Sequence, residues 1–206
     1  MLVPAMNLVE IKKEIEKDSP ILFRKIGYVA KKIDRHLKKN KKITEFSEVY
    51  EYYSKYKNYW LYKLFLKDKV LKYEAMIVYN DIKGHSAIAV VDKNHLVYHT
   101  SHFFMRYNER LNLGLNNFKD IIKEFMKENE IYRFQQLEEI EPGIHKMFCI
   151  LPSGVILGTF YKGLNIVKAN TFISNDMLRN DQIKMKINLT YTIVEDRHTL
   201  GIKINF

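Results

Sequence analysis

The sequence predicts an α+β fold in which a helical N-terminal region precedes a mainly antiparallel β-sheet. Apolar residues recur at intervals of three and four over much of the first 70 residues, as on one face of a helix. From residue 71 onward, short runs rich in valine, isoleucine and aromatic residues alternate with turn signals, which favours antiparallel strands. We therefore expect a helical, basic N-terminal region over residues 1–70 and an α+β domain over residues 71–206.

The N-terminal region begins with two helical patterns. Leu8–Lys17 carries apolar residues at helical spacing, and Ser19-Pro20 opens a second segment because proline is tolerated at a helix start. Over residues 24–42, nine lysines and arginines and one acid, Asp34, surround an apolar stripe. We predict an amphipathic helix whose outer face binds nucleic acid, and a face that serves only solubility is the alternative. The candidate contacts are Lys31, Lys32, Arg35, Lys38 and Lys39.

Residues 44–57 are predicted to continue the helical region, with Thr44 as a cap. Between residues 50 and 62, six tyrosines and Trp60 interleave with lysines. Aromatic faces beside lysines are what a base-stacking platform on single-stranded nucleic acid needs. Ordinary half-buried helix aromatics have the same composition, and we favour that interpretation.

The periodicity changes to that of strands after Lys72. Tyr73–Asn80 and Ser86–Val91 are strand candidates joined by a turn at residues 81–84, and His95–His99 is a third short strand. These three strands predict a meander that leads the chain into the next helix.

That next helix, residues 101–110, separates polar from apolar side chains. Thr100 and Ser101 supply an N-cap, so His102 lies in the first turn, where unpaired backbone N–H groups favour an anion. At helical spacing Arg106, Glu109 and Arg110 share the His102 side, whereas the other side is apolar (Phe103, Phe104, Tyr107, Leu111). The pattern therefore predicts a proton-transfer group beside two phosphate-binding arginines. An exposed helical face with solvent-screened ion pairs is the alternative.

The remaining elements follow the same reasoning. Phe118–Asn129 repeats apolar residues at helical spacing within a long helical insertion, residues 117–139, and Pro142-Gly143 closes a polar, acidic stretch. Turn residues then separate five strand candidates. These are Met147–Leu151, Val155–Tyr161, Ile166–Ile173, Lys184–Val194 and Leu200–Phe206, with a turn at residues 195–198 before the last.

Two segments resemble a known superfamily. The run Thr100-Ser101-His102 followed by Arg106, Glu109 and Arg110 resembles the T-x-H-x-x-x-R-x-x-E-R helix of small toxin-like families grouped with RelE-, barnase-, EndoU- and colicin-type nucleases. Residues 147–173, with Ser153-Gly154 and Thr171-Phe172-Ile173, resemble the sheet of these nucleases and its closing strand. The resemblance implies a toxin- or phage-type protein, from a phage or mobile element, with one or two helices before a four-stranded antiparallel sheet.

The resemblance also implies metal-independent RNA cleavage, in which the 2′-hydroxyl attacks the adjacent phosphate. His102 is then the acid or base, and Arg106 and Arg110 stabilise the charge on the phosphoryl oxygens. Thr171 orients a phosphate or base, and Tyr161 or Lys162 completes the site. Of the other histidines, His85, His145 and His198 lie near turns, and the sequence does not select a second acid or base among them.

The composition favours an anionic partner, and the sequence contains no recognisable cofactor-binding motif. The formal net charge is +10 and the sequence pI is near 9.4, which makes RNA a plausible partner. Cys149 is the only cysteine, so no disulfide framework or thiolate metal cluster is expected. His95, His99 and His102 lack an aspartate or cysteine to complete a metal set, and no glycine-rich phosphate loop is present, so we expect neither metal nor cofactor.

We expect a cytoplasmic protein without a membrane segment, because Met1–Met6 is too short for a secretory signal and no apolar run approaches about 18 residues. The resemblance implies RNA as one partner and an acidic antitoxin or inhibitor protein as another. Two alternatives remain open. One is a non-catalytic nucleic-acid- or protein-binding module on the same scaffold, and the other is an inhibitor that keeps the nuclease scaffold without its chemistry.

Overall fold

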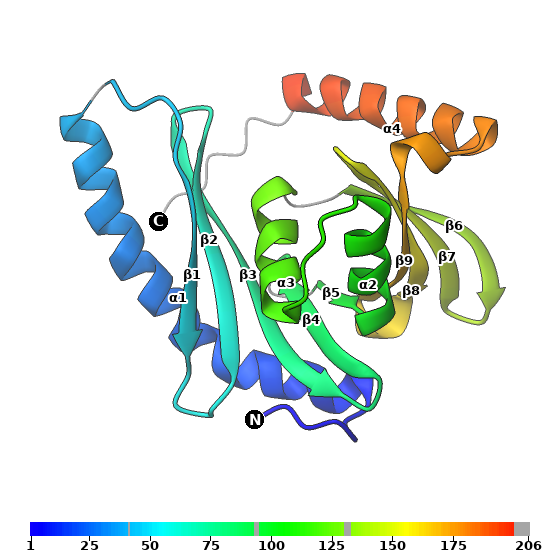
Figure 1. Ribbon diagram of the computed structural model, residues 1–206, viewed down its shortest axis with the longest axis horizontal. Coiled ribbons are helices and arrows are strands. Elements are labelled where there is room, and N and C mark those ends of the chain that lie inside the picture. The colour runs from blue at the N-terminus through cyan, green and yellow to red at the C-terminus, as the bar shows by residue number, and fades with distance from the viewer. Residues whose placement is uncertain (41, 93–94, 130–132, 200–206) are drawn as a thin grey trace.

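A computed structural model describes residues 1–40, 42–92, 95–129 and 133–199, and it contains one nine-stranded sheet with the order β1-β2-β3-β4-β5-β9-β8-β7-β6 (Figure 1). Neighbouring strands are antiparallel, except that β5 and β9 pair in parallel. The predicted α+β class with a mainly antiparallel sheet is therefore confirmed. The strands are β1 (Ser47–Tyr53), β2 (Tyr59–Lys67), β3 (Val70–Asp81), β4 (Gly84–Val90), β5 (Leu96–His99), β6 (Arg133–Glu141), β7 (Ile144–Leu151), β8 (Gly154–Tyr161) and β9 (Ile166–Ser174).

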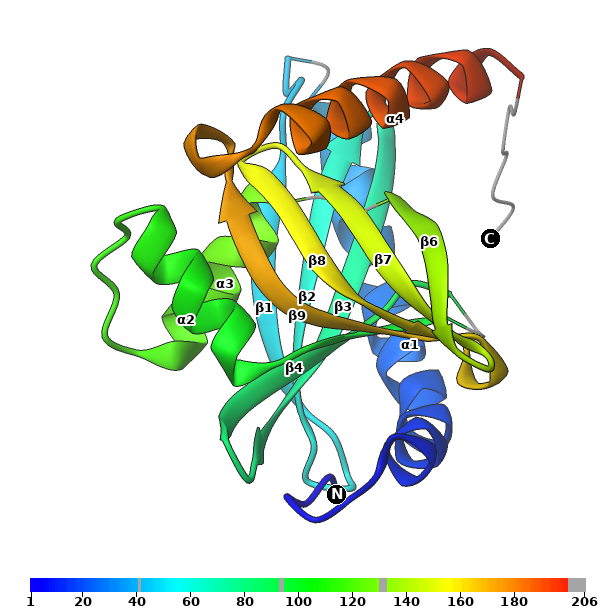
Figure 2. The same ribbon diagram turned by 90° about the vertical axis from the view of Figure 1, so that its right-hand side faces the viewer.

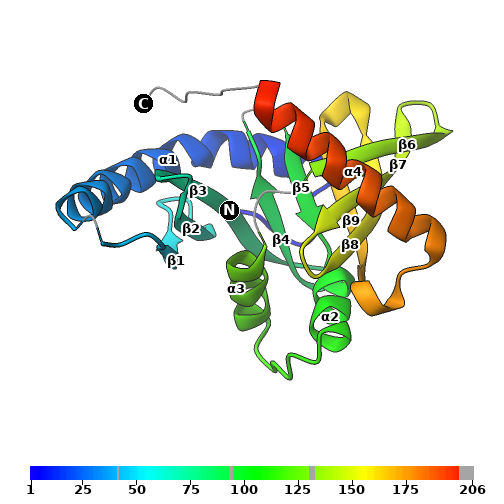
Figure 3. The same ribbon diagram turned by 90° about the horizontal axis from the view of Figure 1, so that it is seen from above.

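Helices cover both faces of the first half of the sheet. The long helix α1 (Leu8–Lys39) packs on one face of β1–β4, and α2 (Ser101–Arg110) and α3 (Phe118–Glu128) pack on the other (Figures 1 and 3). The helix α4 (Asn180–Thr199) crosses one end of the second half (Figure 2), where Lys186 Nζ donates to the Leu151 carbonyl at 2.9 Å. Short 3₁₀ helices η1 (Lys162–Leu164) and η2 (Asn175–Met177) flank β9. No helix within the described residues is long and apolar enough to cross a membrane.

The helix α1 is continuous, and the predicted second start at Ser19-Pro20 is wrong. Asn7 and Glu10 form a reciprocal capping box at its beginning, and Pro20 lies inside it on the exposed side. Proline removes one backbone hydrogen bond from a helix interior. Buried residues on both sides of the proline, Ile15 and Leu22 among them, hold the two parts against the sheet and offset that loss. The predicted amphipathic helix over the basic block is confirmed to Lys39.

The prediction that residues 44–57 are helical is wrong, because this segment contains β1 and the turn that leads to β2. In β2, Tyr59 and Leu61 pack with α2 and α3, whereas Trp60 and Tyr62 pack with α1. Both faces of β2 are thus buried, and its side chains point alternately to the two faces, as in a strand. The hairpin of β2 and β3 runs across residue 70, so one sheet spans the boundary between the two predicted regions.

The later predictions are confirmed in part. The meander β3–β5, the helices α2 and α3 and the strands β7–β9 lie where they were expected. The insertion is helical only to Glu128, because β6 pairs with the edge of β7. The predicted strand at residues 184–194 and the turn at 195–198 belong to α4, and Ile187, one of the alternating apolar residues, is exposed. The predicted strand at residues 200–206 lies outside the described residues.

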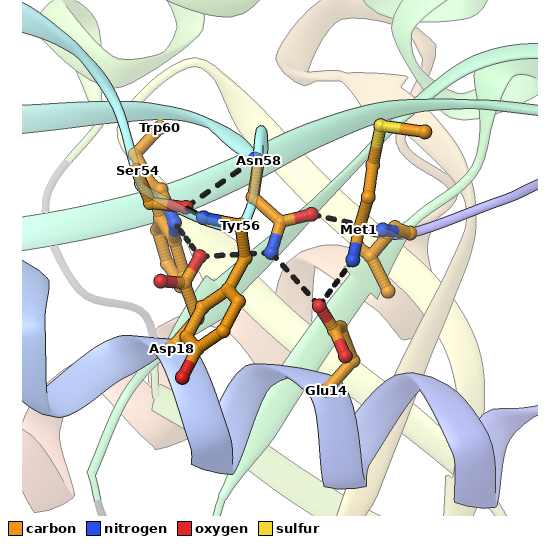
Figure 4. A network of polar contacts seen from close by, with 8 residues as sticks. Met1, Glu14, Asp18, Ser54, Tyr56, Asn58 and Trp60 are labelled. Atoms are coloured by element: carbon orange, nitrogen blue, oxygen red, sulfur yellow. Dashed lines mark hydrogen bonds and ion pairs between the residues drawn. The ribbon is translucent and has the colours of Figure 1, made fainter.

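A buried polar network joins α1 to the turn between β1 and β2 (Figure 4). The Asp18 side chain is fully buried, and its Oδ2 accepts from Asn58 Nδ2 at 2.8 Å and from Trp60 Nε1 at 2.9 Å. Asn58 Oδ1 accepts from the backbone N–H of Leu2 at 2.8 Å, and Glu14 contacts both Asn58 and the amino group of Met1. The network therefore fixes the position of the turn at residues 54–58 relative to α1.

Replacing Asp18 by alanine is expected to destabilise the protein by about 2 kcal/mol, because two buried donors, on Asn58 and Trp60, lose their acceptor. Urea unfolding followed by circular dichroism measures the change. Asp18→Asn is the matched control, since its amide oxygen can still accept one of these bonds and the loss should be smaller. Equal stability of Asp18→Ala and the wild type would show that the network contributes nothing.

Candidate active site

Polar contacts fix the start of α2 against two other parts of the sheet. The Thr100 hydroxyl accepts from the backbone N–H of Phe103 at 3.2 Å and donates to the Ala169 carbonyl on β9 at 3.3 Å. The Ser101 hydroxyl donates to the carbonyl of Lys83 in the turn between β3 and β4 at 3.1 Å. The predicted N-cap is thus confirmed for Thr100, and the first turn of α2 has a defined place at the sheet.

The apolar side of α2 is buried as predicted. Phe103, Phe104 and Tyr107 are almost fully buried. Their rings meet Phe125 of α3 in edge-to-face contacts at 5.1–5.6 Å between centroids, and the ring of Phe172 on β9 lies 5.0 Å from that of Tyr107. This aromatic packing fixes the rotation of α2 about its axis, so the polar side faces solvent.

Three of the four predicted catalytic residues lie on the exposed side of α2. His102 is exposed in the first turn. Arg106 Nη1 lies 2.7 Å from Glu109 Oε2 in an ion pair whose side chains are 40% and 64% exposed. Such a pair contributes about 0.2–1 kcal/mol and can open when a phosphate approaches. Arg110 is half-buried and its Nη1 donates to the Phe172 carbonyl, which leaves other guanidinium donors for a ligand.

The fourth predicted residue, Thr171, does not join this group. Side chains alternate along a strand, and Phe172 points toward α2, where its ring contacts Tyr107. Thr171 therefore lies on the opposite face of β9. Tyr161 and Lys162 lie before β9 begins, whereas Arg110 contacts β9 close to its end. The structure thus separates these three residues from the His102 side of α2.

The basic candidates on α1 form a second, separate group. Lys31, Lys32, Arg35, Lys38 and Lys39 are all exposed on the last turns of the helix. Lys32 Nζ lies 4.5 Å from the centroid of the Tyr28 ring, and Lys38 Nζ lies 2.6 Å from Asp34 Oδ2. Because α1 and α2 cover opposite faces of the sheet, these lysines and His102 do not face one common surface (Figure 3).

His85 is a half-buried histidine that the fold places near the start of α2. It precedes Ala87 and Ala89 on β4, and side chains at this spacing share the face covered by α2 and α3. Gly84 lies close to Ser101, since a Cβ atom placed on Gly84 would be 3.4 Å from Ser101 Cβ. His85 follows Gly84 in the chain and His102 follows Ser101, so the backbones of the two histidines are close. The His85 ring is also 5.2 Å from the ring of Phe118 at the start of α3.

Three of the other histidines have different surroundings. His99 is fully buried among Phe103, Phe104 and Phe125, and burial lowers its pKa to about 3, so it is neutral at physiological pH. His95 Nδ1 lies 2.7 Å from Asp92 Oδ2 just before β5 begins. His145 is buried at the beginning of β7. Neither His95 nor His145 lies near the start of α2.

Sequence reasoning left the role of His85 open, since a histidine beside a turn carries no signal of its own. The alternation along β4 assigns its face, but its proximity to α2 depends on the packing of two distant segments. Among the residues that the structure describes, no group of three histidine, cysteine, aspartate or glutamate side chains could hold a metal ion. No family model matches the chain, and no curated protein or solved structure is detectably similar to it.

Proposed function

We propose that this protein is a metal-independent endoribonuclease whose active site is the exposed side of α2. The observation that carries the proposal is the placement of His102 in the first, solvent-facing turn of α2, one helical turn before Arg106. Arg110, anchored to the carbonyl of Phe172, adds a second guanidinium on the same helix. Guanidinium groups bind phosphate oxygens with two parallel hydrogen bonds, and a histidine exchanges protons near neutral pH.

The proposed reaction is an attack of the RNA 2′-hydroxyl on the neighbouring phosphate. His102 accepts the proton of the 2′-hydroxyl while Arg106 leaves Glu109 and binds the phosphoryl oxygens, whose charge it stabilises. His85 is the candidate to protonate the departing 5′-oxygen, because it follows Gly84, which lies close to Ser101, the residue before His102. The bond to the 5′-oxygen breaks as the bond to the 2′-oxygen forms, and the product is a 2′,3′-cyclic phosphate.

The biological setting belongs to the same proposal. A toxin- or phage-type ribonuclease acts on RNA in the cytoplasm, where a buried, unpaired thiol such as Cys149 stays reduced. An acidic antitoxin or inhibitor protein is the proposed protein partner, because the net charge of this chain is +10.

The test is an incubation of purified protein, in EDTA, with end-labelled single-stranded RNA and with DNA of matching sequence. We expect cleavage of the RNA alone, with products that end in a cyclic phosphate. An RNA that carries one 2′-deoxynucleotide at the main cleavage position should resist cleavage there, because the attacking hydroxyl is missing. Cleavage of the DNA, or cleavage that requires added Mg²⁺, would contradict the proposed mechanism.

The second candidate is a non-catalytic nucleic-acid-binding module. Its support is that Arg106 and Arg110 already have acceptors within the protein and that the basic residues of α1 face another surface. A module of this kind binds RNA with strong salt dependence and leaves it intact in the same incubation.

A further inference from the structure

Two tyrosines, one exposed and one buried, form an aromatic pair at the end of the hairpin of β1 and β2. Tyr53 and Tyr59 are partners in the strand register, and their ring centroids lie 4.8 Å apart with planes tilted by 32°. Tyr59 is buried in the core beneath α2 and α3, whereas Tyr53 is 61% exposed. Tyr53 is thus a solvent-facing ring supported from one side by a fixed ring.

A lysine from another element completes this pair. Lys119 lies in the first turn of α3, after the N-cap Asn117, and its Nζ is 4.4 Å from the centroid of the Tyr59 ring. The same Nζ lies 3.5 Å from Tyr53 Oη. The neighbouring Lys123 is paired with Glu51 at 2.5 Å. Lys119 is thus the lysine of α3 whose ammonium lies over the face of the Tyr59 ring and beside the hydroxyl of Tyr53.

Side-chain hydrogen bonds stabilise the turn between the two tyrosines. The Ser54 hydroxyl accepts from the backbone N–H groups of Tyr56 and Asn58 at 3.2 and 3.3 Å (Figure 4). Asn58 in turn donates to the buried Asp18 on α1. A ring held in place before a ligand arrives loses little conformational entropy on binding.

The aromatic pair and His102 belong to the same face of the sheet. A continuous row of paired residues, Tyr53, Tyr59, Val78, Ala87 and His99, crosses β1 to β5, and His99 directly precedes the N-cap of α2. From Tyr53 to His99 this row crosses four inter-strand spacings, which together correspond to roughly 19 Å. The helices α2 and α3 run side by side in the same direction, with Phe104 and Phe118 in contact at 5.6 Å between centroids (Figures 1 and 2).

We propose that Tyr53 and Lys119 form a nucleotide-binding subsite for single-stranded RNA, in which an unpaired base stacks on Tyr53 and Lys119 binds a phosphate of the same strand. The inference rests on the proposed RNA substrate and adds the place where a distant nucleotide is held. Aromatic stacking accepts any base, so the subsite supplies affinity without strong sequence preference. The span from Tyr53 to His99, three residues before His102, corresponds to about six nucleotides at the stacked rise of roughly 3.4 Å per nucleotide.

The experiment measures affinity by fluorescence anisotropy with a labelled single-stranded RNA of about twelve nucleotides. Its 2′-hydroxyls are methylated, so that it cannot be cleaved. Tyr53→Thr keeps strand propensity and is expected to raise Kd about tenfold, whereas Tyr53→Phe keeps the ring and the affinity. Lys119→Gln should reduce the slope of log affinity against log salt by about one. A duplex of the same sequence has no unpaired base, so Tyr53→Thr should not change its affinity.

Tyr28→Thr is the matched control, because Tyr28 is also an exposed tyrosine beside a lysine but lies on the other face of the sheet. Unchanged affinity of Tyr53→Thr, an equal loss in Tyr28→Thr, or no binding by the wild type would each overturn the subsite. If the wild type cleaves RNA and Tyr53→Thr binds normally, the subsite is wrong and the nuclease stands. If binding depends on Tyr53 but RNA stays intact, the subsite stands and the nuclease proposal fails.

Discussion

Replacing His102 by alanine is expected to reduce RNA cleavage by about 10²–10⁴-fold, the usual contribution of a positioned acid or base. His102 is exposed, so its loss leaves no cavity and removes no buried hydrogen bond. RNA affinity should stay nearly unchanged, because the arginines and lysines rather than this single imidazole supply most of the attraction to phosphates. Single-turnover cleavage in EDTA and anisotropy with the methylated RNA measure the two quantities separately.

The control for this variant is Met105→Ala, which changes an exposed side chain on the same helix, 59% accessible, without touching the polar group. We expect it to cleave RNA like the wild type. Full activity of His102→Ala would exclude His102 as the acid or base. A joint loss of cleavage, binding and the unfolding transition would instead assign it a structural role.

The parts of the fold that sequence reasoning located correctly are those that local chemistry determines. The helix α2 has its own cap, Thr100, and one apolar side, so its bounds and its rotation follow from ten residues. Three of the four residues expected to act together, His102, Arg106 and Arg110, come from this one helix. Their grouping needs no knowledge of the tertiary structure.

The segments that were predicted wrongly depend on contacts with distant residues. β1 and β2 are dense in tyrosine, and their alternation is masked because both faces of β2 are buried, Trp60 toward α1 and Leu61 toward α3. β6 is polar and forms a strand through its pairing with β7. In the same way, the separation of Thr171 from α2 depends on which face of β9 each residue occupies, and that face is set by Phe172 in the core.

One buried cation of the first half of the sheet has a structural role that its sequence context did not indicate. Lys63 on β2 is 2% exposed, and its Nζ donates to the carbonyls of Met126 and Asn129 at 2.7 and 3.2 Å. The last carbonyls of a helix have no partner within the helix, and a cation there also favours the helix dipole. The Glu74 carboxylate on β3 lies 3.9 Å away. Lys63 therefore fastens the C-terminal end of α3 to the sheet.

Replacing Lys63 by methionine is expected to destabilise the protein by about 4 kcal/mol, because the carbonyls at the end of α3 lose their donor and the buried carboxylate of Glu74 loses an ammonium partner. Methionine has a similar volume, so packing changes little. Urea unfolding measures the loss. The double variant Lys63→Met, Glu74→Gln should recover part of it, since no buried charge then remains at this position. Recovery of none of it would assign the whole effect to the carbonyls of α3.

The pH dependence of the destabilisation caused by Lys63→Met distinguishes the effect of the Lys63 charge from the effect of its hydrogen bonds. Burial lowers the pKa of Lys63 in the folded protein below the ordinary lysine value of 10.5. Between the lowered pKa and 10.5, the unfolded chain holds a proton on this lysine that the folded protein has released, so the wild type gains stability as pH rises. Lys63→Met cannot titrate here, and the difference in unfolding free energy between the two proteins should widen over that interval. A difference that stays constant up to pH 10.5 would show that the folded protein does not shift this pKa.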